Sequence, residues 1–275
     1  MVSTATIVFV VLTLFVSLIL PVLVLIIFAA KNRKQGIVSA WLLGAAGFFV
    51  PQILIRLPIL TALQSQSWFL SFSQNHLFGY AFGLAFTAGL FELAGRFAVA
   101  RILQKKLTLK RSLAAGLGHG GIEAMIIIGI TYINKLVYIF LINSGGFDAV
   151  VAQSAAAGVD VAQLELIRTQ LVSMSPLMFS LAGFERLLAM TAHTAMSLIV
   201  CYGVAHKKAL PCLLVCLGIH TLTDLTAGIS LVLPQNIAYP IIYTILIAMA
   251  AISIVLIRNI CRRWQETEAT YDSEE

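Results

Sequence analysis

The residues with the clearest chemical potential are a histidine and a glutamate, His119 and Glu123, inside an apolar segment. They lie four residues apart, so their side chains share one face of a helix. The glycines beside them, Gly118, Gly120 and Gly121, leave room for another backbone or a substrate to approach. Ionisable groups in hydrocarbon are costly unless they have partners, so this pair indicates a functional site.

Three other apolar segments carry matching polar residues. These are Glu92 with Arg96, Glu185 and Arg186 with His193, and His220 with Asp224. Residues four or seven apart project to one helix face, and lipid-facing charges are strongly disfavoured. Counted from the basic end of each segment, most of these side chains fall in a layer near the middle of the membrane, with Glu185 and Arg186 about two helical turns further out. We therefore expect one buried polar site.

The composition predicts the elements that must position these residues. The chain has 275 residues, of which 60% are hydrophobic and 11% are charged. This balance excludes a water-soluble domain and predicts an all-α, polytopic helical membrane protein. We expect one transmembrane domain over residues 1–258 and a disordered, acidic cytoplasmic tail over residues 259–275. The seven expected spans are approximately 5–30, 37–60, 79–103, 112–133, 176–205, 209–232 and 237–257.

Basic residues gather in alternate loops, which predicts the orientation of the chain. By the positive-inside rule, the N-terminus lies outside and the C-terminus lies in the cytoplasm of a multi-pass cell-membrane protein. The net charge of +6 therefore reports topology rather than nucleic-acid binding. Arg56, near the outer end of the second span, is expected to extend to the membrane surface rather than to pair inside the bundle. Residues 148–172 are expected to form a helix on the outer face.

Three functions are compatible with such a buried set. It could be purely structural, or it could belong to a proton- or cation-coupled transporter, since carboxylates and histidines also form proton relays. Against transport, the sequence shows no inverted repeat, and the seventh span has no ionisable residue deep in the membrane. An enzyme that acts within the bilayer is therefore favoured.

The motifs resemble those of the YhfC family of bacterial membrane proteins. They are Phe91-Glu92-Leu93-Ala94-Gly95-Arg96-Phe97, the stretch Gly116 to Ala124, Glu185-Arg186 with His193, and His220 with Asp224. The resemblance also places the chain with the CAAX-prenyl proteases and bacteriocin-processing enzymes. It implies an intramembrane endopeptidase that acts on membrane proteins or peptides. The resemblance departs at one position, because the related proteases usually have a second glutamate where this chain has Leu93. If both acids are required, the chain would be a non-catalytic scaffold relative.

In a metal-free mechanism, Glu92 would be the general base that activates water, beside Arg96. His119 would orient this water or protonate the leaving amine. Glu123 would hold His119 or share the role of base.

The remaining residues would stabilise the transition state. His193 and His220 would bind the oxyanion, and Asp224 would fix the tautomer of His220. In the alternative, metal-dependent mechanism, His119, His193 and His220 would bind one zinc ion, and Glu92 would be the base. The sequence contains no His-Glu-x-x-His motif, so by itself it favours the metal-free mechanism.

Overall fold

The computed structural model describes the backbone of residues 1–274 and the side chains of residues 1–267. The described part is helical and contains no strand. Seven helical stretches in it are long and apolar enough to cross a membrane. They are Thr4–Lys31, Ile37–Gln64, Leu77–Lys106, Leu109–Ser144, Met178–Ala205, Ala209–Val232 and Gln235–Thr267. The all-α, seven-span prediction is confirmed, and the orientation of the termini stays a prediction.

Within the predicted transmembrane domain the chain forms two compact units. The first unit comprises Met1–Val22 and Ala124–Leu187, and the second comprises Leu23–Glu123 and Leu188–Glu275. Because the unit boundaries fall inside the first, fourth and fifth spans, each of these spans contributes residues to both units. All of the predicted site residues except Glu185 and Arg186 belong to the second unit.

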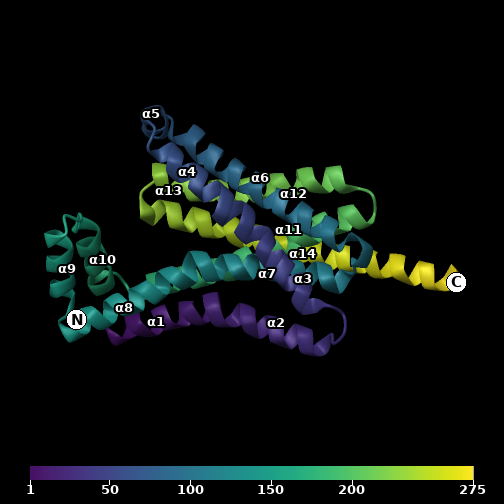
Figure 1. The fold of residues 1–275 in the computed structure, drawn as a ribbon, viewed down its shortest axis with the longest axis horizontal. Helices are drawn as coiled ribbons and strands as arrows, with labels where there is room; N and C mark the ends of the chain where they lie inside the picture. Colours follow the sequence, from purple (N-terminus) through teal and green to yellow (C-terminus); the bar gives the residue numbers. More distant parts are fainter. Residues whose placement is uncertain (275) are drawn as a thin grey trace. The chain divides into compact units, whose positions relative to one another are not determined.

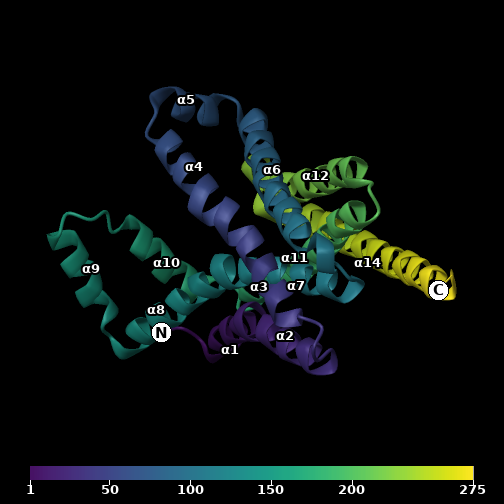
Figure 2. The same cartoon turned by 45° about the vertical axis from the view of Figure 1, so that its right-hand side comes forward.

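The first unit is built around helix α8. Its helices are α1 (Thr4–Leu14), η1 (Phe15–Ile19), η4 (Met125–Gly129), α8 (Ile130–Ser144), α9 (Phe147–Ala156), α10 (Ala162–Ser173) and the start of α11 (Met178–Ala205). Thr13 Oγ1 and Tyr132 Oη both donate to the Phe179 carbonyl, each at 2.8 Å. Figure 2 shows α9 and α10 beyond the end of α8. The expected single surface helix is therefore two short helices, separated by a turn at Gly158, which has a φ of +75°.

The second unit contains the helices that carry the site. They are most of α2 (Leu20–Lys31), α3 (Ile37–Phe48), η2 (Phe49–Arg56), α4 (Leu57–Gln64), α5 (Ser67–Asn75), α6 (Leu77–Leu103), η3 (Gln104–Lys106), α7 (Leu109–Ala124), the rest of α11, α12 (Ala209–Leu225), η5 (Thr226–Gly228), α13 (Ile229–Val232) and α14 (Gln235–Glu274). Helix α6 packs against α12 on one side and α3 on another (Figure 1). This central place positions the two charged residues of α6, Glu92 and Arg96, inside the unit.

Helix α14 continues past Arg258 into the segment that the sequence predicts to be disordered. Trp264 in this segment is only 4% exposed, and its ring packs against those of Tyr202 and His206 at centroid distances of 5.8 and 5.6 Å. The structure thus differs from the prediction, because an aromatic anchor in the basic part of the tail holds the first turns as helix.

Glycines bring the backbones of α3, α6 and α7 into direct contact. A Cβ atom added to Gly95 of α6 would lie 1.9 Å from the carbonyl oxygen of Gly47 in α3. A Cβ atom at Gly118 of α7 would lie 2.0 Å from the carbonyl oxygen of Trp41, also in α3. Small residues permit such close helix packing in membranes. Gly95 and Gly118 directly precede Arg96 and His119. The close contacts with α3 therefore fix the positions of both site residues along their helices.

We expect Gly95→Ala to destabilise the protein, because the added methyl group has to displace backbone rather than a flexible side chain. The expected loss is about 1–3 kcal/mol, as for other overpacked interiors. It should appear as a lower thermal unfolding temperature in detergent. Gly83→Ala on the same helix is the matched control, since a Cβ atom there meets nothing within 4 Å. Equal unfolding temperatures for the two variants would contradict the close packing of α3 on α6.

Candidate active site

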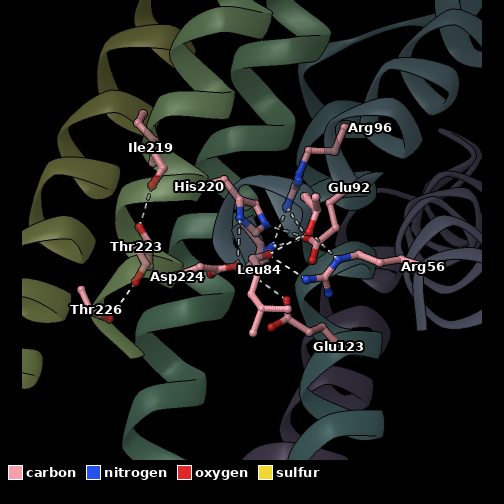
Figure 3. Close-up of polar contacts among 12 residues, drawn as sticks. Arg56, Leu84, Glu92, Arg96, Glu123, Ile219, His220, Thr223, Asp224 and Thr226 are labelled. Atoms are coloured by element: carbon pink, nitrogen blue, oxygen red, sulfur yellow. Dashed lines mark hydrogen bonds and ion pairs between the residues drawn. The ribbon is translucent and has the colours of Figure 1, made fainter. Parts of the chain in front are cut away.

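A single carboxylate oxygen, Oε2 of Glu92, is the centre of the buried polar residues (Figure 3). It accepts from His119 Nε2 at 3.0 Å, from His220 Nε2 at 2.9 Å and from Arg96 Nη2 at 3.2 Å. Glu92 is 3% exposed. Because a carboxylate only accepts, the Nε2 atom of each imidazole carries a proton in this arrangement. Three helices, α6, α7 and α12, thus meet at one oxygen atom.

His193 of α11 joins the group through both of its ring nitrogens. Its Nδ1 lies 2.6 Å from Arg96 Nη2 and 3.6 Å from Glu92 Oε2, and its Nε2 lies 2.7 Å from Glu123 Oε2. A guanidinium only donates, so Nδ1 is the unprotonated nitrogen, and Nε2, which faces Glu123, carries the proton of the neutral ring. The lone pair of His193 therefore points toward Arg96 and Glu92. This tautomer is the one in which Nδ1 can bind a metal ion.

His220 lies between two carboxylates. Its Nε2 donates to Glu92, and its Nδ1 lies 3.3 Å from Asp224 Oδ2, one turn further along α12. The side chain of Asp224 is 36% exposed, whereas that of His220 is 2% exposed. His220 therefore has a buried carboxylate on one side of its ring and a partly exposed carboxylate on the other.

Seven of the predicted site residues come together as what we call the Glu92 cluster. Its members are Glu92, Arg96, His119, Glu123, His193, His220 and Asp224. Two details were not specified by the sequence. Glu123 contacts His193 of α11, at 2.7 Å between Oε2 and Nε2. Glu185 and Arg186 form an ion pair with each other at 2.6 Å within the first unit. Leu93, the residue after Glu92, belongs to a hydrophobic core cluster.

Arg56 is a functional candidate that the sequence reasoning placed wrongly. It is 7% exposed, and it donates from Nη2 to the Leu84 carbonyl at 2.7 Å and from Nε to Thr87 Oγ1 at 3.3 Å. Figure 3 shows its side chain pointing toward Glu92. The prediction that it extends to the membrane surface is therefore wrong. Its position beside two prolines at a span end suggested an interfacial residue, and only the packing on α6 shows otherwise.

The Glu92 cluster has a donor set that fits a divalent metal ion. Candidate ligand atoms of Glu92, His119 and His193 all lie within 4.8 Å of one another. Neighbouring ligands of a tetrahedral zinc ion are about 3.4 Å apart, so a small side-chain contraction would be enough. Imidazole and carboxylate are common zinc ligands, and Glu123 supplies the carboxylate that orients a ligand histidine. This set contains Glu92 in place of His220, unlike the three-histidine set expected from the sequence.

The second unit also contains an apolar cavity of about 610 Å³, and some of its lining residues are close to Asp224 in the sequence. Its walls come from α6, α12, η5, α13 and α14, and include Leu222, Leu225 and Thr226, which flank Asp224 along the chain. Apolar pockets with polar groups nearby are the usual form of ligand sites. The lining that the structure gives for this cavity is almost wholly apolar and contains no member of the Glu92 cluster.

Comparison with known proteins identifies the family. Residues 16–247 match the family described as YhfC intramembrane metalloprotease. The chain is 31% identical over 229 residues to the uncharacterized membrane protein YhfC of Bacillus subtilis (strain 168), covering 82% of this chain and 86% of that protein. No solved structure matches. The family match spans most of the chain and includes every residue of the Glu92 cluster, so the chain belongs to the YhfC intramembrane metalloprotease family.

Proposed function

We propose that this protein is a metal-dependent intramembrane endopeptidase that hydrolyses peptide bonds of membrane proteins or peptides. The observation that carries the proposal is the convergence of histidines from three helices on one buried carboxylate oxygen, Glu92 Oε2. Such a group is costly in hydrocarbon and has the composition of a zinc site. The family description supports proteolysis and metal dependence. The relation to CAAX-prenyl proteases stays a prediction, as does residence in the cell membrane.

In this proposal Glu92, His119 and His193 hold the metal. When bound there, a zinc ion supplies an activated water molecule and polarises the scissile carbonyl. The carboxylate of Glu123, 2.7 Å from His193 Nε2, would favour the tautomer that carries its proton on Nε2 and so leave the Nδ1 lone pair available. The ring of Phe48 packs edge-on against His119 at a centroid distance of 5.5 Å, which limits rotation of that imidazole.

Arg96 and His220 would serve the reacting groups. Arg96 Nε and Nη1 are buried and have no hydrogen-bond partner among the described residues. They can therefore donate to a substrate carbonyl oxygen as negative charge develops on it. His220, between Glu92 and Asp224, would donate a proton to the leaving amine, and Asp224 is exposed enough to return one from solvent.

The metal-dependent mechanism replaces the metal-free one that the sequence alone favours. Two observations support the change. The first is the family description, and the second is the short separation of the candidate ligand atoms of Glu92, His119 and His193. A metal-free glutamic mechanism would leave Glu92 as the base, with its Oε2 already bonded by two imidazoles and a guanidinium. Such a carboxylate has little remaining capacity to accept a proton from water.

The proposal is tested on purified protein reconstituted in liposomes with labelled membrane peptides. We expect cleavage, about one zinc ion per chain, loss of cleavage with a chelator, and recovery when zinc is restored. Ion-gradient uptake of a solute into the same vesicles, with no cleavage of any peptide, would instead establish the transporter function. Cleavage that resists chelators in metal-free protein would restore the glutamic mechanism.

A further inference from the structure

The segment η2, Phe49–Arg56, is a π-helix that follows the close contact between α3 and α6. It contains Pro51, which lacks the N–H group of a regular helix. Wide π-turns inside membrane-spanning or soluble helices are frequently found at functional sites. Two polar side chains of this segment, Gln52 and Arg56, are buried, at 9% and 7% exposed. With about 4.4 residues per π-turn, positions four apart lie on nearly the same face.

Arg56 is a buried cation without a direct counterion. Its two hydrogen bonds go to neutral oxygens, the Leu84 carbonyl and Thr87 Oγ1. Asp224 and Glu92 act on it electrostatically, but no carboxylate oxygen of the described residues lies within ion-pair distance of its guanidinium. A guanidinium has five N–H groups, and the two hydrogen bonds recorded for Arg56 use Nε and Nη2, so the N–H groups of Nη1 are available to a further acceptor. Arg56 can therefore donate to a further oxygen atom near the Glu92 cluster.

The side-chain oxygen of Gln52 has no hydrogen-bond partner in the described part of the chain. This Oε1 atom is fully buried. Leaving a buried amide unpaired is unfavourable, so a native structure normally supplies such a group with water or a ligand. The same π-helix thus offers one unsatisfied acceptor, Gln52 Oε1, and unsatisfied donors on Arg56.

An acceptor and a donor side by side complement one peptide group. A transmembrane substrate bonds its own backbone internally, and it has to unwind locally before a peptide bond can be hydrolysed. The unwound N–H and C=O groups then require partners, because hydrocarbon provides none. Accepting the proposed proteolytic function, we propose that η2 binds an unwound peptide group of the substrate beside the scissile bond. Its N–H donates to Gln52 Oε1, and its C=O accepts from Arg56 Nη1.

The test uses blocked fluorescent hexapeptides of leucine and alanine, and a series in which each amide in turn is replaced by an ester. An ester keeps the shape of the backbone but lacks the N–H group. Binding to reconstituted protein is measured by fluorescence anisotropy. For wild type, we expect an ester at one position to weaken binding by about tenfold, the usual value of one buried hydrogen bond. Gln52→Leu should bind the amide peptide about tenfold more weakly than wild type does. Replacing the amide by the ester should not weaken its binding further.

Arg56→Lys keeps the charge but lacks the planar fork, so it should weaken binding of every peptide without removing the ester effect. Gln64→Leu, at the exposed end of α4, is the matched control and should bind as wild type does. All variants are compared by size exclusion and thermal unfolding. An ester effect that persists in Gln52→Leu would overturn the inference, as would a wild type that binds none of the peptides. Peptide hydrolysis is measured separately. If the ester effect is present in wild type and absent in Gln52→Leu, but no peptide is hydrolysed, only the proposed function is refuted.

Discussion

Glu92→Gln should abolish hydrolysis of membrane peptides and strip the protein of its metal ion. The amide keeps the shape of the side chain but is a poor metal ligand, and it offers only one acceptor atom to the two imidazoles and Arg96. We expect a rate loss of at least about 10³-fold, since both the metal and the charged centre of the site are affected. Initial rates in liposomes and the metal content of the purified variant measure the two effects together.

Glu165→Gln is the matched control, because Glu165 lies in the short helix α10 with a half-exposed side chain that pairs with Arg168. This variant should retain both cleavage and metal. Near-normal cleavage by Glu92→Gln would remove Glu92 from the active site. Lost cleavage with an intact metal content would instead assign Glu92 the role of base, as in the zinc mechanism expected from the sequence.

The three histidines should separate into two classes when each is replaced by alanine. His119→Ala and His193→Ala should lose most of the bound zinc, because their ring nitrogens belong with Glu92 to the compact ligand group. His220→Ala should keep zinc and lose activity by about 10²–10³-fold, because it removes the group proposed to protonate the leaving amine. Zinc per chain and cleavage rate, measured on the same preparations, distinguish the classes.

His76→Ala provides the control for this series, since His76 lies at the junction of α5 and α6 and contacts the ring of Phe72. It should retain zinc and cleavage. Equal zinc loss in His119→Ala, His193→Ala and His220→Ala would favour the three-histidine site. Failure of all three to accumulate as folded protein would show that the Glu92 cluster serves structure alone.

The sequence predicts the membrane spans and the membership of the site well, because both depend on strong physical penalties. A run of about 20 apolar residues can hardly be anything but a span, and charged residues within it have to face inward. The i, i+4 spacing of Glu92 with Arg96 and of His220 with Asp224 therefore leads directly to pairs that the structure contains, at 3.2 and 3.3 Å.

Partners on different helices could not be predicted in the same way. Spacing along one helix says nothing about which side chain of α11 approaches α7, so the contact between Glu123 and His193 cannot be read from the sequence. Arg56 was misplaced because the depth of a side chain depends on helix irregularity. The π-helical turns of η2 and the acceptors on α6 keep it inside the bundle.

The Glu92–Arg96 pair also has a consequence for biosynthesis. The third, fifth and sixth spans have mean hydropathies of 1.5, 1.6 and 1.6, against 3.2 for the first span. The third span leaves the ribosome before His119, His193 and His220 exist to bond Glu92. Its own arginine one turn away is then the only nearby countercharge on that helix, and it reduces the cost of partitioning Glu92 into lipid. The same ion pair that shapes the finished site thus helps the third span to enter the bilayer, and the site can be completed only when the sixth span has been translated.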